Sequence, residues 1–87
     1  MYKSDEKILE LIEVLKTNST IRFEQDFCDE VGVLRQTIYR VKKGVTRFTP
    51  KHIQTICLKY NVNSNWIFGI ETSIYRTKKT NPSLTKK

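Results

Sequence analysis

Carboxylates are missing from the middle of the sequence: between Gly32 and Ile70 there is no Asp or Glu, although seven Lys or Arg residues lie in that stretch. The formal charge is −4 over residues 1–31, +7 over 32–70 and +4 over 71–87, which together give the net charge of +7. A surface whose charge serves solubility mixes both signs. A one-sided distribution attracts polyanions, so it favours nucleic acid as the partner.

Cysteine is also scarce. Cys28 and Cys57 lie far apart, and neither has a second Cys or His at the spacing of a metal site. We expect two small buried residues in a reducing cytoplasm, with a disulfide between them as the alternative. The sequence lacks a nucleophile with a convincing base, paired carboxylates in a polar pocket, and a glycine loop for phosphate. We therefore expect no enzyme, no metal and no cofactor.

Long apolar runs are absent as well. Met1 leads into the polar segment KSDEK, whereas a signal peptide continues into an apolar run, and no stretch approaches the length of a transmembrane helix. No segment joins a basic face to a long apolar face with interfacial Trp or Phe, as a helix lying on a membrane needs. These absences predict a cytoplasmic protein without a membrane partner.

The length limits the architecture. A chain of 87 residues builds one hydrophobic core and leaves little volume for a deep catalytic cleft. From residue 71 onward the sequence is polar and basic with few apolar side chains, which is typical of a disordered tail. We predict one domain at residues 1–70 and a basic, mostly disordered tail at 71–87.

Apolar spacing predicts two helices in the acidic part. Ser4 is expected to cap the first, which buries residues three and four positions apart: Ile8, Leu11, Ile12 and Leu15. The second helix is expected to turn three residues into the core: Phe23, Phe27 and Val31. Two starts are open for it, a cap at Ser19 or Thr20 and a first turn at Phe23. Gly32 suits the left-handed backbone that ends a helix.

Gly32 and Val33 alone separate the second helix from a third, predicted from Leu34 to Lys42 and stopped by Gly44. Helices joined by so short a turn cross at a steep angle. At about 100° per residue, one arc of roughly 60° holds the anchoring side chains Leu34, Ile38 and Val41. The opposite arc of roughly 140° holds Arg35, Gln36, Tyr39, Arg40 and Lys43. The third helix is thus expected to be anchored by one face and to present the other.

Residues 45–49 are predicted to form a loop carrying Arg47. Thr49 followed by Pro50 is a typical helix start. The fourth helix is expected to stop at Asn61 and to bury Ile53, Ile56, Cys57 and Tyr60. A short fifth helix is predicted to be capped by Ser64, to bury Trp66 as a core side chain, and to end at Gly69. A weak strand-like alternation follows at Ile70, Thr72 and Ile74.

Five short helices with one tight turn resemble the helix-turn-helix domain of the lambda-repressor and Cro family of phage and bacterial transcriptional regulators. The segment EVGVLRQTIYRVKKG is similar to the turn and recognition helix of that family, and YNVNSNWIFGIE is similar to its helix 4 to helix 5 ending. The resemblance covers about residues 4–70. It implies an all-α, five-helix lambda-repressor-like domain, with the helix-turn-helix at the second and third helices.

The resemblance implies a sequence-specific transcriptional regulator, expected to be a repressor, that places its third helix in the major groove of double-stranded DNA. The base-reading positions of the family fall on Arg35, Gln36 and Arg40. Their chemistry fits, because Arg can bond guanine O6 and N7 and Gln can bond the N6 and N7 edge of adenine. Thr37 and Tyr39 are expected to touch a thymine methyl or a phosphate, although packing over a neighbouring side chain is an equal alternative for Tyr39.

Phosphate contacts are expected from basic side chains at the helix end and in the loops, which are Lys42, Lys43, Arg47 and Lys51. A single module makes few base contacts, and relatives bind as pairs, so we expect a homodimer at least on DNA. Two dimer surfaces are open: the fifth helix with Ile70 and Ile74, and the exposed side of the first helix.

Two residues depart from the family pattern. Relatives often begin their second helix with a phosphate-binding Gln, where this chain has Glu24; either the helix docks differently or Glu24 turns away from DNA. Leu34 stands where relatives cap the third helix with Ser or Thr. Glu24 supports the main alternative, a helix-turn-helix-fold protein-interaction module such as an antitoxin or adaptor. A third function is nonspecific binding of single strands or RNA through the basic tail.

Overall fold

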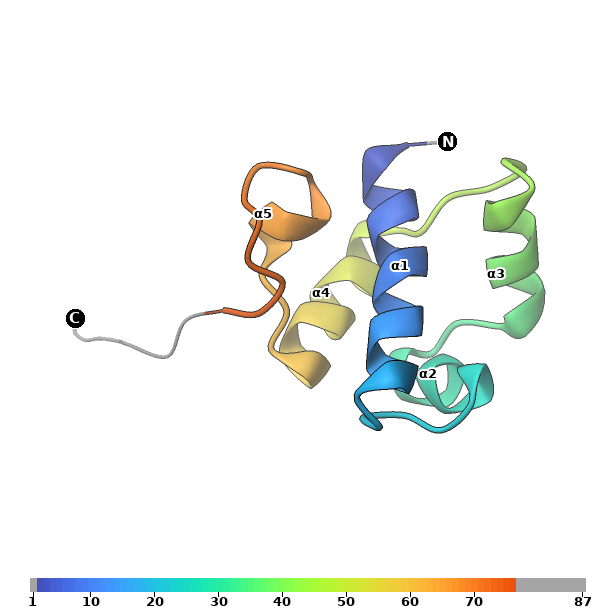
Figure 1. Cartoon of the computed structure of the whole chain (residues 1–87). Coiled ribbons are helices and arrows are strands. Elements are labelled where there is room, and N and C mark those ends of the chain that lie inside the picture. Colours follow the sequence, from blue (N-terminus) through green and yellow to red (C-terminus); the bar gives the residue numbers. More distant parts are fainter. Residues whose placement is uncertain (1, 77–87) are drawn as a thin grey trace.

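The computed structural model describes residues 2–76, and within them the chain forms five helices and no strand. The helices are α1 (Lys3–Thr17), α2 (Glu24–Val31), α3 (Arg35–Lys42), α4 (Pro50–Tyr60) and α5 (Ser64–Ile67) (Figure 1). The prediction of an all-α fold with five helices is confirmed. Among the helices of this segment, none has the length and apolar character needed to cross a membrane.

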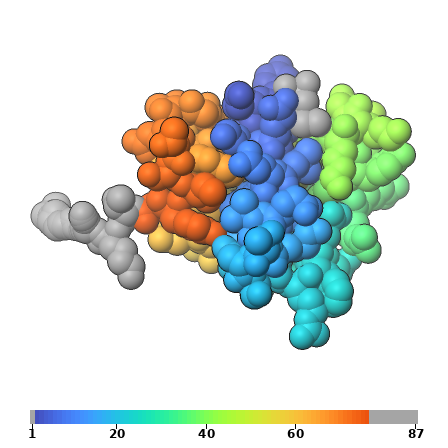
Figure 2. Space-filling model, viewed as in Figure 1, coloured from blue at the N-terminus to red at the C-terminus, as the bar shows by residue number. Residues whose placement is uncertain are grey.

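Each of the main contacts between helices involves α1 or α2. Helix α1 packs against α2 and α5, while α2 also contacts α3 and α4. Figures 1 and 2 show α3 on one flank of the molecule and α5 on the opposite flank, with α1 between them, and in Figure 1 the loop after α3 runs behind α1 to α4. The main contact of α3 is with α2, the helix before it in the sequence. Helix α3 therefore lies at the periphery, and its outer side is uncovered.

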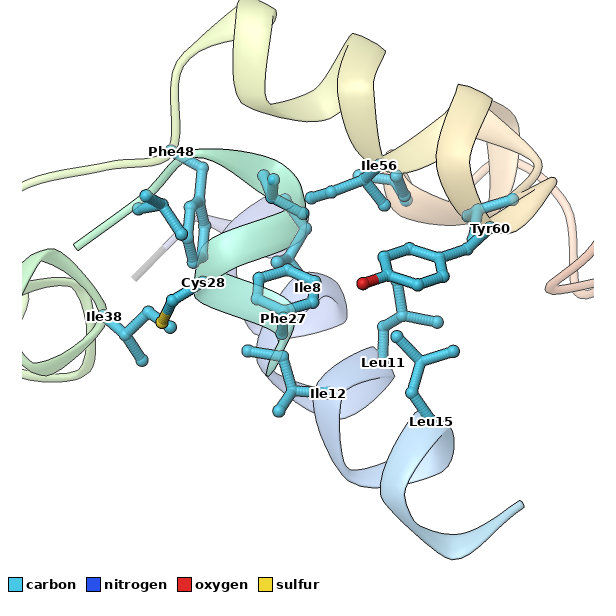
Figure 3. Close-up of a cluster of buried hydrophobic side chains, with 14 of the residues drawn as sticks. Ile8, Leu11, Ile12, Leu15, Phe27, Cys28, Ile38, Phe48, Ile56 and Tyr60 are labelled. Carbon is cyan, nitrogen blue, oxygen red and sulfur yellow. The ribbon is translucent and has the colours of Figure 1, made fainter. Parts of the chain in front are cut away.

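A single core joins the helices. The four predicted α1 residues are buried, with Ile8 and Leu11 at 0% exposure. Phe27 of α2 lies in the middle of the cluster in Figure 3, and its ring stacks on that of Tyr60 with the centroids 6.0 Å apart. The Tyr60 hydroxyl donates to the Glu30 carboxylate, and burial together with this bond raises the pKa of Tyr60. Burying each large apolar side chain contributes about 1.5–3 kcal/mol, so this cluster is the main source of stability.

Two predicted core residues are instead exposed, Phe23 at 62% and Leu34 at 69%. Each is the residue before a helix, in extended backbone with ψ of 157° at Phe23 and 146° at Leu34. The angular spacing of a helix does not apply to a residue outside it, so their assignment to the buried faces was wrong. The second helix begins at Glu24, later in the sequence than the predicted starts at Ser19 or Thr20 and at Phe23.

Two predicted caps were also wrong. Ser4 lies inside α1, which begins after Tyr2, and α5 is capped by Asn63, whose side chain accepts a hydrogen bond from the backbone N–H of Asn65. At the start of α2, the Asp26 carboxylate accepts from the backbone N–H groups of Phe23 at 2.9 Å and Arg22 at 3.0 Å. These bonds lower the pKa of Asp26. The starts of α2 and α5 are thus capped by Asp26 and Asn63, whereas the start of α1 has no side-chain cap.

The predicted helix ends are confirmed. Gly32 and Asn61 follow α2 and α4 in left-handed backbone, with φ of 81° and 57°. A side chain at Gly32 would meet the steric cost of positive φ, which only glycine avoids. The tight turn between α2 and α3 therefore depends on this glycine.

The start of α4 is the predicted Thr49–Pro50 pair. The hydroxyl of Thr49 accepts from the backbone N–H of His52 at 3.2 Å, and the N–H of Thr49 donates to Nδ1 of His52 at 3.1 Å. Only a neutral imidazole offers Nδ1 as an acceptor. Burial and the neighbouring charge of Lys51 lower the pKa of His52 from its ordinary value of 6.5.

The protein is therefore expected to lose stability in mild acid. As the pH falls through about 6.5, the unfolded chain takes up a proton that the folded chain resists, so the free energy of unfolding decreases and levels off below the lowered pKa. Urea unfolding between pH 7.5 and 5 tests this, since His52 is the one histidine of the chain. His52→Gln should flatten the dependence in that window; an equally steep loss in the variant would exclude His52 as its source.

The cysteines are unlinked. Both are free thiols, as expected, and Cys28 is buried, but Cys57 is only half-buried, although it was predicted to be buried. Burial raises the pKa of each thiol, which keeps them protonated and poorly reactive at neutral pH.

The folded unit continues past the predicted boundary at residue 70. The backbone N–H of Arg76 donates to the Asn61 carbonyl at 2.9 Å, and that of Asn63 donates to the Ile74 carbonyl at 2.7 Å. Val62 and Tyr75 form an isolated antiparallel bridge. Residues 71–76 are thus held against the turn between α4 and α5, and assigning them to a disordered tail was wrong. The remainder of the predicted tail, 77–87, lies outside the described residues.

Candidate nucleic-acid interface

Helix α3 is held by one face. Ile38 and Val41 are both at 0% exposure and connect the helix to the core, as predicted. The exposed side carries the side chains Arg35, Gln36, Tyr39, Arg40, Lys42 and Lys43, and Thr37 is half-buried between the two faces. Arg47 in the following loop and Lys51 in the first turn of α4 are exposed as well. Eight of the nine predicted contact residues are therefore open to solvent, and Thr37 is the most withdrawn.

The two ends of α3 differ in whether side chains complement the helix dipole. Its first turn has no acidic residue and no side-chain cap, since the preceding residue is Leu34. Its last turn carries Arg40 and Lys42, which complement the negative end of the helix dipole. The helix therefore has no carboxylate of its own.

A carboxylate from α2 nevertheless reaches this surface. Glu24 Oε2 lies 3.9 Å from Nε of Arg35, and Glu24 Oε1 lies 3.8 Å from Nζ of Lys42. The Glu24 side chain is 21% exposed, against 63% for Arg35 and 54% for Lys42. Although residues 32–70 contain no Asp or Glu, the α3 surface therefore includes a carboxylate, which Glu24 of α2 supplies. The Glu24 carboxylate faces α3 in the free protein, and the two alternatives for its position on DNA stay predictions.

The loop after α3 is tied to the start of α1. The guanidinium of Arg47 lies over the ring of Tyr2, 3.6 Å from its centroid, and Nε of Arg47 is 4.0 Å from Oδ2 of the buried Asp5. Oδ1 of Asp5 accepts from the backbone N–H of Phe48 at 3.1 Å. Arg47 is therefore ordered by side chains that no pattern in the sequence had connected with it, yet 57% of its own side chain stays exposed.

Two aromatic residues take different places. Tyr39 is 60% exposed, and Nζ of Lys43 lies 5.4 Å from its ring centroid. Trp66 is 3% exposed, as predicted for a core side chain, and Nζ of Lys7 lies 4.9 Å from its ring. Tyr39 is thus available to a ligand at this surface, whereas Trp66 is not.

Within residues 2–76, no three His, Cys, Asp or Glu side chains gather as a metal site would require. Comparison with known proteins found no matching family model, no similar curated protein and no similar solved structure. The function is therefore argued from the α3 surface itself.

Proposed function

We propose that the protein is a sequence-specific, double-stranded DNA-binding transcriptional regulator of the lambda-repressor and Cro type, acting as a repressor. One observation carries the proposal. A short helix beside a tight turn is anchored through Ile38 and Val41, and its solvent side presents guanidinium, amide, phenol and ammonium groups without a carboxylate of its own. These groups donate the hydrogen bonds that base edges and phosphates accept.

The dimensions of α3 suit the major groove. An α-helix with its side chains is about 10–12 Å across, close to the major-groove width of about 12 Å, and α3 has only eight residues. In this arrangement Arg35, Gln36 and Arg40 read base edges, and Thr37 and Tyr39 contact a thymine methyl or a phosphate. The phosphate contacts come from Lys42, Lys43, Arg47 and Lys51, which lie at the end of α3 and in the segments after it. Base contacts supply selectivity, and phosphate contacts supply affinity and orientation.

Selection of bound sequences from a random duplex pool tests the proposal. We expect one motif to be enriched. We also expect the logarithm of the affinity to fall linearly with the logarithm of salt concentration, with a slope per bound chain of roughly −3 to −4 for four phosphate contacts at about −0.9 each. A pool that stays random after repeated rounds, or an affinity that does not change with salt, would reject the proposal.

Pairing on DNA is part of the proposal. Three exposed apolar side chains lie on or near α4 and α5, namely Leu58, Phe68 and Ile70, whereas Ile74 is half-buried. The exposed side of α1 carries the acidic residues Glu6, Glu10 and Glu13, so α5 is the better dimer surface. Light scattering on a palindromic duplex whose half-sites lie about 34 Å apart should show two chains per duplex. A complex of one chain with one duplex would contradict pairing.

The alternative function is a protein-interaction module that has lost DNA reading, such as an antitoxin or adaptor. The position of Glu24 against α3 supports it, because a carboxylate there opposes phosphate binding. The salt experiment separates the two functions, since an interaction module neutralises no phosphates. Removing residues 77–87 tests the third function, nonspecific binding of single strands or RNA through the basic tail. That function predicts a loss of binding, whereas the proposed function predicts that sequence-selective binding remains.

A further inference from the structure

Glu24 has an unusual place for an acid beside a basic surface. Of the ion pairs formed within residues 2–76, two end on its carboxylate, one from each end of α3. Arg35 and Lys42 are seven positions apart, so two helical turns bring them to the same edge of the helix. That edge faces the start of α2, where Glu24 is the first helical residue. Gln36, Arg40 and Lys43 lie on the rest of the exposed arc.

The contact with Arg35 uses one particular nitrogen. The ion pair is to Nε, and within the described segment Arg35 forms an ion pair with no other residue. An arginine bonds guanine O6 and N7 with two N–H groups of its planar fork. At 3.9 Å, beyond hydrogen-bond distance, the Glu24 carboxylate attracts the guanidinium toward this edge of α3 by its charge and leaves the outer end of the guanidinium free for a base.

The same carboxylate opposes phosphates. Its side chain is 21% exposed, so water and salt screen it less than they screen a fully exposed charge. It also engages Lys42, which we assign to phosphate binding, and so reduces the attraction of this edge for any DNA backbone. For a random duplex, which offers no matched guanine to Arg35, Glu24 only lowers the affinity.

We propose that Glu24 is a positioning and specificity-determining residue, which orients Arg35 for guanine and weakens binding to DNA of random sequence. The proposal rests on the proposed function. The contacts of Glu24 thus raise the ratio of selected to random affinity, although they lower the total attraction to DNA.

The test is Glu24→Gln, which keeps the shape of the side chain and removes its charge. Affinity for random duplex should rise, the salt slope should move toward the steeper end of the range of roughly −3 to −4 as Lys42 is released from Glu24 to its phosphate, and the ratio of selected to random affinity should fall roughly tenfold. The preference at one base pair should weaken. In an Arg35→Ala background the same change should still strengthen random binding but no longer alter that preference.

Glu10→Gln is the matched control. It makes the same change in net charge at an exposed position of α1, where Glu10 forms no ion pair with a described residue of α3, so slope and ratio should stay at their wild-type values. A Glu24→Gln protein that folds normally by circular dichroism and keeps the wild-type ratio would overturn the inference, as would a change equal to that of Glu10→Gln. If the wild-type protein binds no duplex, or binds duplexes with an affinity that does not change with salt, the proposed function is rejected and the inference is rejected with it.

Discussion

Arg35→Ala is expected to weaken binding to the selected duplex about 5- to 140-fold and to abolish the preference for one base pair. A bidentate contact to a base edge is worth about 1–3 kcal/mol of discrimination, which converts to that range of affinity. Random duplexes should lose far less, because they offer no matched guanine. Titrating the variant against the selected duplex and its single-base-pair variants measures both effects.

Lys43→Ala is the comparison for Arg35→Ala. Its ammonium lies beside Tyr39 just after the end of α3 and is assigned to a phosphate. Its removal should weaken all duplexes alike and reduce the magnitude of the salt slope by about 1. Equal loss of base preference in the two variants would show that the roles of Arg35 and Lys43 are wrongly divided.

Ile38→Ala is expected to lower the free energy of unfolding by about 2–5 kcal/mol. Ile38 is at 0% exposure, and its side chain ties α3 to the core (Figure 3). A small domain has a total stability of about 5–15 kcal/mol, so the loss would remove a large part of it. Chemical denaturation of the variant gives the value directly.

Leu34→Ala supplies the control on the same anchoring arc. The sequence pattern placed both residues there, but Leu34 is 69% exposed, so its truncation should change stability by less than about 0.5 kcal/mol. Similar costs for the two substitutions would mean that Leu34 is buried in solution, or that Ile38 does not hold α3 in place.

Inside the helices, the sequence predicted the core well. The spacing of Ile8, Leu11, Ile12 and Leu15 reflects 3.6 residues per turn, and all four are buried. The same reasoning failed at Phe23 and Leu34 because both precede a helix in extended backbone. Apolar spacing alone does not say where a helix begins, and an error of one residue moves a side chain from the core to the surface.

Turn chemistry was predictable wherever a residue had a conformational reason for its place. Gly32 and Asn61 adopt the expected left-handed backbone, and Thr49 caps α4. The segment 71–76 was missed because its hydrogen bonds run to the turn between α4 and α5 and carry no periodic signal. Local rules therefore located the turns but not the contacts that a later segment makes with them.

The α3 surface was predictable in its residues and not in its environment. The exposed set follows from the helical period, whereas the approach of Glu24 to Arg35 and Lys42 depends on how α2 crosses α3. The stack of Arg47 on Tyr2 joins residues far apart in the sequence and has no sequence signature. Charge counted along the chain thus overstated how basic this surface is.

Amide chemical shifts recorded while the selected duplex is titrated into labelled protein test the central claim most directly. With α3 in the major groove, the largest changes should fall on residues 35–43 and on Arg47, while the amides of the buried α1 residues Ile8 and Leu11 should stay nearly constant. Changes centred on α1 or α5, with α3 unaffected, would contradict the account.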